Sequence, residues 1–170
     1  MKKALVLLVA PLMAFALELG SIPLHVSLEG DNGGYLDGSA WSSEMLRDKV
    51  HVLFYVDPDE KETNSAFSDA LKAKKFDRAN FASVAIVNMA ATWLPDFAIA
   101  SKLKKKQKEF PHTIYVKDLN KVLVNKWKIA DDSSDVLLFD KKGKLIFKHE
   151  GKLSQEQIDA VIALIEERIS

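Results

Sequence analysis

Residues 50–64, VHVLFYVDPDEKETN, form the stretch that decides the fold of this chain. The run 50–56 is apolar and rich in β-branched and aromatic residues, which predicts a buried strand. Pro58 and its acidic neighbours then predict a turn, and helix signals begin near Lys61. Because the ligands of open α/β sheets gather beyond the carboxyl ends of strands, this turn is where we expect function to lie.

Strand and helix patterns alternate on both sides of this stretch. Upstream, alternation over 24–28 predicts a half-buried strand, and a glycine-rich turn at 30–34 leads to a second short strand near 35–36. Downstream, the patterns predict a helix from about residue 61, strands at 81–88, 113–117, 136–139 and 145–147, a helix at 96–110, a hairpin turn at 140–143 and a final helix after residue 154. Residues 118–127 fit either a strand or a short helix capped by Asp118, and their apolar spacing favours the helix.

The composition is that of an ordinary globular protein. A chain of 170 residues suffices for one domain of about 150 residues with a substantial core. The 24 basic and 24 acidic side chains cancel, which argues against nucleic acid, because its partners present a basic face. The chain has no cysteine, which excludes thiol catalysis, cysteine-ligated zinc and iron–sulfur clusters.

The first 16 residues have the pattern of a secretory signal peptide. They combine a positive start at 1–3, an apolar run at 4–16 and a small-x-small cleavage pattern at 14–16. The run is too short to span a bilayer, so we expect cleavage after Ala16 or a residue or two later. The resulting expectation is a single domain over 17–170, located in the periplasm, without stable membrane insertion after cleavage. The alternatives are an uncleaved anchor and a buried N-terminal helix.

The order of predicted elements resembles the thioredoxin fold, and the added N-terminal segment resembles its peroxiredoxin and TlpA-like branch. A closer resemblance is carried by Lys61-Glu62-Thr63-Asn64, Ile86-Val87-Asn88, Trp127, Asp132-Ser133-Ser134 and Asp140-Lys141-Lys142-Gly143. On these residues the chain resembles the YtfJ family of bacterial periplasmic proteins, from about residue 50 to the C-terminus. The resemblance implies an α/β thioredoxin-like fold, with a mixed central sheet flanked by helices and an N-terminal β-hairpin extension. It also implies export, in a family without an established activity.

The chain departs from working thioredoxins at two places. The positions that correspond to their catalytic thiols fall near Glu60 and Thr63, and neither is cysteine. The position of their cis-proline, before the strand at 136–139, belongs to Ser134, where we expect a trans bond because a cis bond without proline costs about 2.5–4 kcal/mol. The sequence therefore predicts a protein that is inactive in thiol redox chemistry, and we assign no catalytic residue.

Two polar segments form the candidate binding cleft, one after the strand at 50–56 and one before the strand at 136–139, where a polar loop is expected. Its residues are Asp57, Asp59, Glu60, Thr63, Asn64, Asp132, Ser133, Ser134 and Asp135. Free backbone N–H groups at a helix N-terminus suit an anion, whereas carboxylates suit a cation or a basic partner. Acidic residues at helix starts also occur simply because they are solvated and favourable to the helix dipole.

We therefore expect a binding or interaction module, without cofactor or metal ligand set, whose partner is an unknown periplasmic protein or small ligand. The alternative from another class is a non-thiol enzyme or a cation-binding protein that uses the acidic loops at 57–62 and 131–135.

Overall fold

The computed structural model describes residues 17–170, so the expected signal peptide lies outside the described residues. Its elements are β1 (Ser27–Leu28), β2 (Gly33–Tyr35), β3 (Trp41–Ser42), β4 (Val50–Val56), α1 (Ser65–Lys74), β5 (Phe81–Asn88), α2 (Asp96–Glu109), β6 (Thr113–Asp118), α3 (Val122–Trp127), β7 (Ser134–Phe139), β8 (Leu145–His149) and α4 (Gln155–Ile169). Short 3₁₀ turns precede α1 at Pro58–Glu60 and follow β5 at Met89–Ala91. Within 17–170, no helix is long and apolar enough to cross a membrane.

A six-stranded mixed sheet forms the centre, in the order β2-β6-β5-β4-β7-β8. Strands β4, β5 and β6 run parallel, whereas β7 is antiparallel to β4 and β8 is antiparallel to β7. This arrangement confirms the predicted thioredoxin-like fold with its mixed sheet. The N-terminal strand pair is also present, but β1 pairs with β3, and the intervening β2 joins the edge of the main sheet beside β6.

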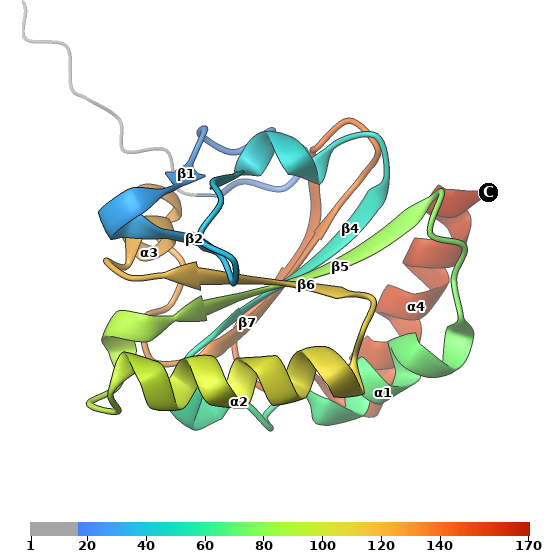
Figure 1. Cartoon of the computed structure of the whole chain (residues 1–170). Coiled ribbons are helices and arrows are strands. Elements are labelled where there is room, and N and C mark those ends of the chain that lie inside the picture. Colours follow the sequence, from blue (N-terminus) through green and yellow to red (C-terminus); the bar gives the residue numbers. More distant parts are fainter. Residues whose placement is uncertain (1–16) are drawn as a thin grey trace, which may run out of the picture.

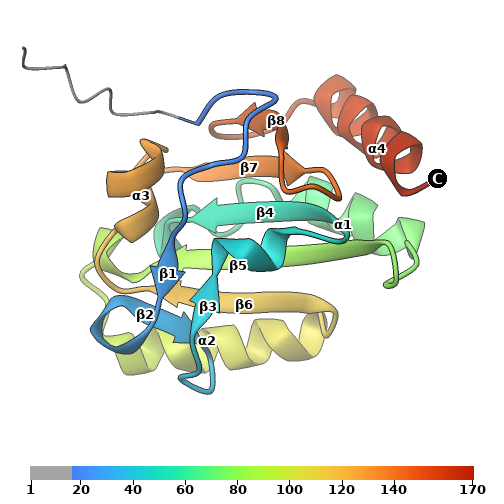
Figure 2. The ribbon, with the colours of Figure 1, turned by 90° about the horizontal axis from the view of Figure 1, so that it is seen from above.

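Helices cover both faces of the sheet (Figure 1). The helices α1, α2 and α4 lie on one face, and α3 with the N-terminal strands lies on the other. Figure 2 shows β4 and β5 in the interior of the sheet, flanked by neighbouring strands. Because β4 is covered on both faces, six of its seven residues are buried, which explains why its sequence is apolar apart from His51.

Two helix ends follow the sequence prediction. Ser154 and Gln157 form the expected capping box at the start of α4, whose buried side includes Ile158, Val161 and Ile165. The segment 118–127 contains the short helix α3, and the Asp118 carboxylate accepts the backbone N–H groups at its start. The helical alternative for this segment is therefore confirmed.

The N-terminal strands differ from the prediction, since β1 covers only Ser27–Leu28 of the expected 24–28 and β2 begins at Gly33, inside the expected turn. Two further boundaries differ at the candidate cleft. Helix α1 begins at Ser65 rather than near Lys61, because Asp57 and Pro58 start a separate 3₁₀ turn whose Asp59 N–H donates to the Asp57 carboxylate. Strand β7 begins at Ser134, so the expected polar loop is shorter, because Ser134 pairs with Val56 of β4. Ladder hydrogen bonding outweighs the polar character of these side chains.

Candidate functional site

The two predicted segments lie side by side at one edge of the sheet. The Asp57 N–H donates to the Ser133 carbonyl oxygen at 2.9 Å. The register of β4 with β7 places Val56 opposite Ser134 and Tyr55 opposite Asp135. The two segments therefore meet where β4 ends and β7 begins, as expected for a strand-to-helix turn of this fold.

Four of the predicted cleft residues are buried: Asp57, Asn64, Ser134 and Asp135. Asn64 is the most connected of them. Its amide nitrogen Nδ2 lies 3.1 Å from both the carbonyl oxygen and Oγ of Ser134 and 3.0 Å from the Gly151 carbonyl. Its oxygen Oδ1 accepts the Leu153 N–H at 3.0 Å. The Asn64 side chain therefore joins the start of α1 to β7 and to the loop before α4, and its hydrogen-bonding groups are engaged within the protein.

The remaining predicted residues form the accessible part of the cleft. Asp59, Glu60 and Asp132 are exposed, while Thr63 and Ser133 are half-buried. The Thr63 hydroxyl donates to the Glu60 carboxylate at 2.5 Å. What the cleft offers to solvent is therefore mainly carboxylate oxygen.

These carboxylates lie close enough to influence one another. Burial raises the pKa of the Asp57 carboxyl, and the negative charges of Asp59, Asp132 and Glu60 raise it further. We call Asp57, Asp59, Glu60 and Asp132 the acidic cleft. The Asp57 side chain is buried, so it adds negative charge beneath the exposed carboxylates but is not itself open to solvent.

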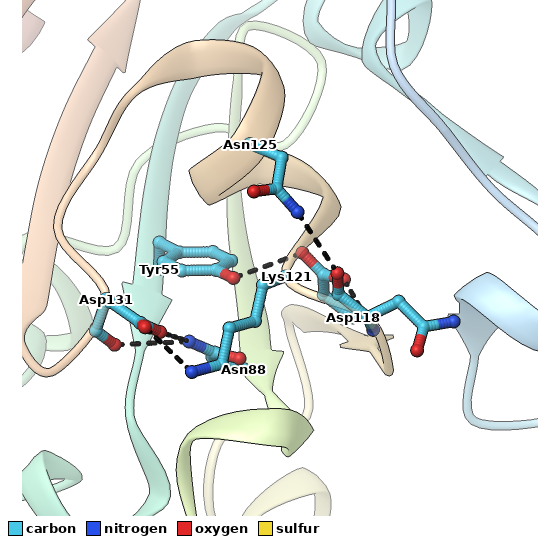
Figure 3. Close-up of polar contacts among 7 residues, drawn as sticks. Tyr55, Asn88, Asp118, Lys121, Asn125 and Asp131 are labelled. Atoms are coloured by element: carbon cyan, nitrogen blue, oxygen red, sulfur yellow. Dashed lines mark hydrogen bonds and ion pairs between the residues drawn. The ribbon is translucent and has the colours of Figure 1, made fainter.

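A second polar cluster lies beneath α3, on the opposite face of the sheet from α1 (Figure 3). The buried Tyr55 hydroxyl donates to Asp118 Oδ2 at 3.1 Å. The same carboxylate accepts the N–H groups of Val122 and Leu123 at 2.9 and 3.0 Å. Burial, followed by the adjacent Asp118 charge, raises the pKa of the Tyr55 hydroxyl far above its usual range, so it acts as a hydrogen-bond donor.

Asn88 and Lys121 hold the loop that leads into the acidic cleft (Figure 3). Asn88 Nδ2 donates to the backbone and side-chain oxygens of Asp131, at 3.1 and 2.9 Å. Lys121 Nζ lies 2.7 Å from Asp131 Oδ2, and this contact lowers the pKa of the Asp131 carboxyl. Asp131 is thus held by two partners from outside its own loop, which fixes the position of neighbouring Asp132.

Asp135 is the strongly perturbed carboxyl of this region. Burial raises its pKa to about 6, although the Ala130 N–H donates to its Oδ2 at 3.0 Å. Its Oδ1 and the Oδ1 of Asn88 are buried without a hydrogen-bond partner among the described residues. No group of three or more His, Asp or Glu side chains within 17–170 could hold a metal ion.

The sequence prediction included the acidic loops and gave Asp118 as a helix cap, but it assigned no site role to Asp118, Tyr55, Asn88 or Lys121. Three of these close parallel strands, since Tyr55 lies near the end of β4, Asn88 ends β5 and Asp118 ends β6. The sequence did contain a signal for these three residues, because each is a polar residue at or near the last position of one of the neighbouring parallel strands. Lys121 had no such signal, because its contact with Asp131 depends on the path of the chain around α3.

Comparison with solved structures supports the fold. A putative thiol:disulfide interchange protein DsbE from Chlorobium tepidum superposes with a TM-score of 0.64 at 16% identity, covering 91% of this chain and 100% of its own. The pneumococcal exposed lipoprotein thioredoxin from Streptococcus pneumoniae gives 0.60 at 16% identity, with 85% and 99% coverage. At this identity the likeness shows the thioredoxin-like fold alone.

The family follows from sequence comparison. The family model described as "Bacterial protein of unknown function (YtfJ_HI0045)" matches residues 26–168. The chain belongs to the YtfJ family. Among its relatives, an uncharacterized protein of Haemophilus influenzae is 30% identical over 128 residues, covering 74% of this chain and 70% of its own length. The uncharacterized protein YtfJ of Escherichia coli is 27% identical, with 96% and 94% coverage.

This member of the YtfJ family carries no sulfur nucleophile at the site where thioredoxin-fold oxidoreductases keep their thiols. Glu60 and Thr63 occupy that turn and bond to each other. The cleft of this YtfJ-family protein can therefore offer oxygen ligands and charge, but it has no group for disulfide exchange.

Proposed function

We propose that the protein is an exported, redox-inactive binding module whose acidic cleft receives a basic segment of a periplasmic partner. The observation that carries this proposal is the convergence of Asp57, Asp59, Glu60 and Asp132 at the strand-end position where ligands of this fold gather. Export rests on the pattern of residues 1–16. Charge complementarity of this kind steers association and fixes the orientation of a partner.

The hydrogen bonds of the turn favour a cationic partner over an anionic one. The N–H of Asp59 donates to the Asp57 carboxylate, and the N–H groups of Glu60 and Thr63 donate to the carbonyls of Asp57 and Glu60. An anion at this turn would have to compete with these internal acceptors and with the surrounding carboxylates. A Lys- or Arg-rich segment instead meets the exposed carboxylate oxygens of Asp59, Glu60 and Asp132.

Charge reversal at two exposed positions tests this proposal. The pair Glu60→Lys and Asp132→Lys changes the sign of the cleft, and each change should alter stability by only about 0.5 kcal/mol because both side chains are exposed. Synthetic Lys- and Arg-rich peptides, measured by fluorescence anisotropy over a range of salt concentrations, serve as probes. The parent should bind them with an affinity that falls as salt rises, and the pair should lose this binding.

A matched control carries the same change in net charge. Glu29→Lys with Glu44→Lys reverses two exposed acidic residues of the N-terminal segment, and it should bind the basic peptides as the parent does. Equal binding by the cleft pair and the parent would exclude the acidic cleft as the functional surface. The Glu60→Lys, Asp132→Lys pair should also gain affinity for Glu-rich peptides, because the two new lysines attract negative charge.

A further inference from the structure

A deep groove lies on the opposite face of the sheet from α3, between α1 and α2. Its volume is about 700 Å³, within the range of small-molecule sites. The floor consists of β5 with its neighbours β4 and β6, and the walls are the facing sides of the two helices. One end of the groove reaches Asn64 and Ser134, so it passes beside the acidic cleft but is lined by different side chains over most of its length.

The hollow has a cause in the sequence of β5. Ser83 and Ala85 are small side chains on the groove face, and the register places them beside Thr113 and Tyr115 of β6. A large side chain at either position would fill the space between the helices. Core residues around this hollow keep a residual exposure of 6–8%, which is higher than that of most of the core: Phe54, Leu71, Val87, Leu103 and Tyr115. The groove is thus an apolar channel that remains open to solvent.

The groove has a charged end. Lys72, Lys75 and Arg78 line it near the amino end of β5, and none of the three forms an ion pair with a carboxylate among the described side chains. Lys72 Nζ lies over the Phe110 ring and near the Glu109 carbonyl, and Arg78 contacts His112 Nε2, so a bound carboxylate would meet these cations in place of neutral partners. In contrast, Lys106 on the α2 wall lies 3.8 Å from Glu62 and 3.4 Å from Glu109. The positive charge available to a ligand is therefore concentrated at the end of the groove where β5 begins, next to Arg78.

We propose that this groove binds a free long-chain fatty acid, with its carboxylate at Lys72, Lys75 and Arg78 and its acyl chain along β5. From Phe81 to Val87 the strand offers an apolar path of about 20 Å. An extended acyl chain matches this path, and a single anionic head group matches the three basic side chains. The inference stands independently of the acidic cleft.

The structure disfavours a peptide in this place. Strand β5 is hydrogen-bonded to β4 on one side and β6 on the other, so its backbone offers no edge to an added strand. Two contacts also cross the mouth from α1 and its preceding turn to α2, Lys72 Nζ with the Glu109 carbonyl and Lys106 with Glu62. A helix, about 10 Å or more across, would have to open both contacts. An acyl chain needs neither a hydrogen-bond partner nor so wide an entrance.

Calorimetric titration with laurate, and with dodecanol of the same chain length, tests the proposal. Laurate should bind, and affinity should rise roughly fourfold for each further buried methylene along a series of longer acids kept below their micelle-forming concentrations. The head-group pair Lys75→Glu with Arg78→Glu should weaken laurate binding at least tenfold and leave dodecanol binding unchanged. The matched control, Lys104→Glu with Lys108→Glu on the exposed side of α2, should change neither.

The second part of the experiment fills the floor of the groove with a larger side chain. Ala85→Leu should reduce the binding of laurate and dodecanol alike by at least tenfold, and Ser83→Leu repeats the test should the first variant fail to fold. Absence of laurate binding by the parent, or unchanged binding in both folded floor variants, would overturn the proposal. Binding only to phosphatidylglycerol vesicles, or only to an apolar peptide, would overturn it equally. The Glu60→Lys, Asp132→Lys pair should retain laurate binding, so failure here is distinguishable from failure of the acidic cleft.

Discussion

Asn64 and Ser134 are joined side chain to side chain, although 70 residues separate them in the sequence. Asn64 Nδ2 donates to both the Oγ and the carbonyl oxygen of Ser134, each at 3.1 Å. In a working thioredoxin these two places adjoin the reactive thiols and the cis-proline. Here the Asn64 amide acts as a clamp that joins these two places in a fixed junction between α1 and β7.

Removing the clamp should destabilise the whole domain. Asn64→Ala leaves Ser134, Gly151 and the Leu153 N–H without their buried partner, and we expect a loss of about 2–4 kcal/mol in the free energy of unfolding. Urea denaturation followed by circular dichroism measures it. The control Asn125→Ala removes a single 3.4 Å contact at an exposed site and should cost less than about 0.5 kcal/mol. Similar losses in the two variants would contradict a structural role for Asn64.

Asp135 should make stability depend on pH. Burial raises its pKa to about 6, from an ordinary value of 3.8, so the folded state binds this proton more tightly than the unfolded state. Its contribution is therefore fully present below about pH 4 and is lost as the pH rises through 6. Asp135→Asn keeps an acceptor for the Ala130 N–H and removes the titration.

The variant should therefore gain stability relative to the parent between pH 4 and 7, by on the order of 1–2 kcal/mol at the upper end. Thermal or urea unfolding across this range measures the difference, with Asp69→Asn on the exposed side of α1 as the control. A constant difference between parent and Asp135→Asn at every pH would refute the assignment.

Tyr55 and Asp118 should be energetically coupled. Tyr55→Phe removes one buried hydrogen bond, at an expected cost of about 1 kcal/mol. Asp118→Ala also removes the acceptor for the first N–H groups of α3, and it should cost about 2–4 kcal/mol. A double-mutant cycle should give a coupling energy of at least about 0.5 kcal/mol, and strict additivity would show that the two groups do not interact in solution.

The protein should have no thiol redox activity. Without a cysteine there is no thiolate to attack a disulfide or a peroxide. Insulin reduction and peroxide consumption, each assayed with several thiol donors, should not exceed the rate of a heat-denatured sample. Any turnover that depends on the folded chain would require a chemistry that its residues do not supply.

Export should leave a mature chain that begins near Leu17 or Glu18. The prediction rests on the pattern of residues 1–16 alone, and a chain that begins at Leu17 would keep the contacts that Leu17 makes in the folded domain. Leu17 is buried, its N–H donates to the Trp127 carbonyl at 3.3 Å, and its own carbonyl accepts from Lys148 Nζ at 2.8 Å. Intact-mass measurement of the periplasmic fraction tests it, and a full-length chain confined to the cytosol would exclude export.

Patterns of local periodicity predicted the helices and strands of the core well. The apolar run at 50–56, the capping box at Ser154 and the helical spacing before Trp127 each correspond to an observed element. The start of α1 was placed too early because a 3₁₀ turn at Pro58–Glu60 precedes it, and the start of β7 was placed too late because Ser134 pairs with Val56 of β4. Sequence reasoning predicted that the two polar segments meet, but it did not predict which of their residues would be buried.

What the sequence by itself determined was the fold class, the family and the absence of thiol chemistry, because these depend on periodicity, on motif order and on one missing residue type. The tertiary structure decided which polar residues face solvent. It buried Asp57, Asn64, Ser134 and Asp135 and left Asp59, Glu60 and Asp132 exposed. It also produced the groove between α1 and α2. The small side chains of Ser83 and Ala85 leave a space only because α1 and α2 pack side by side over β4, β5 and β6 without closing the gap between them.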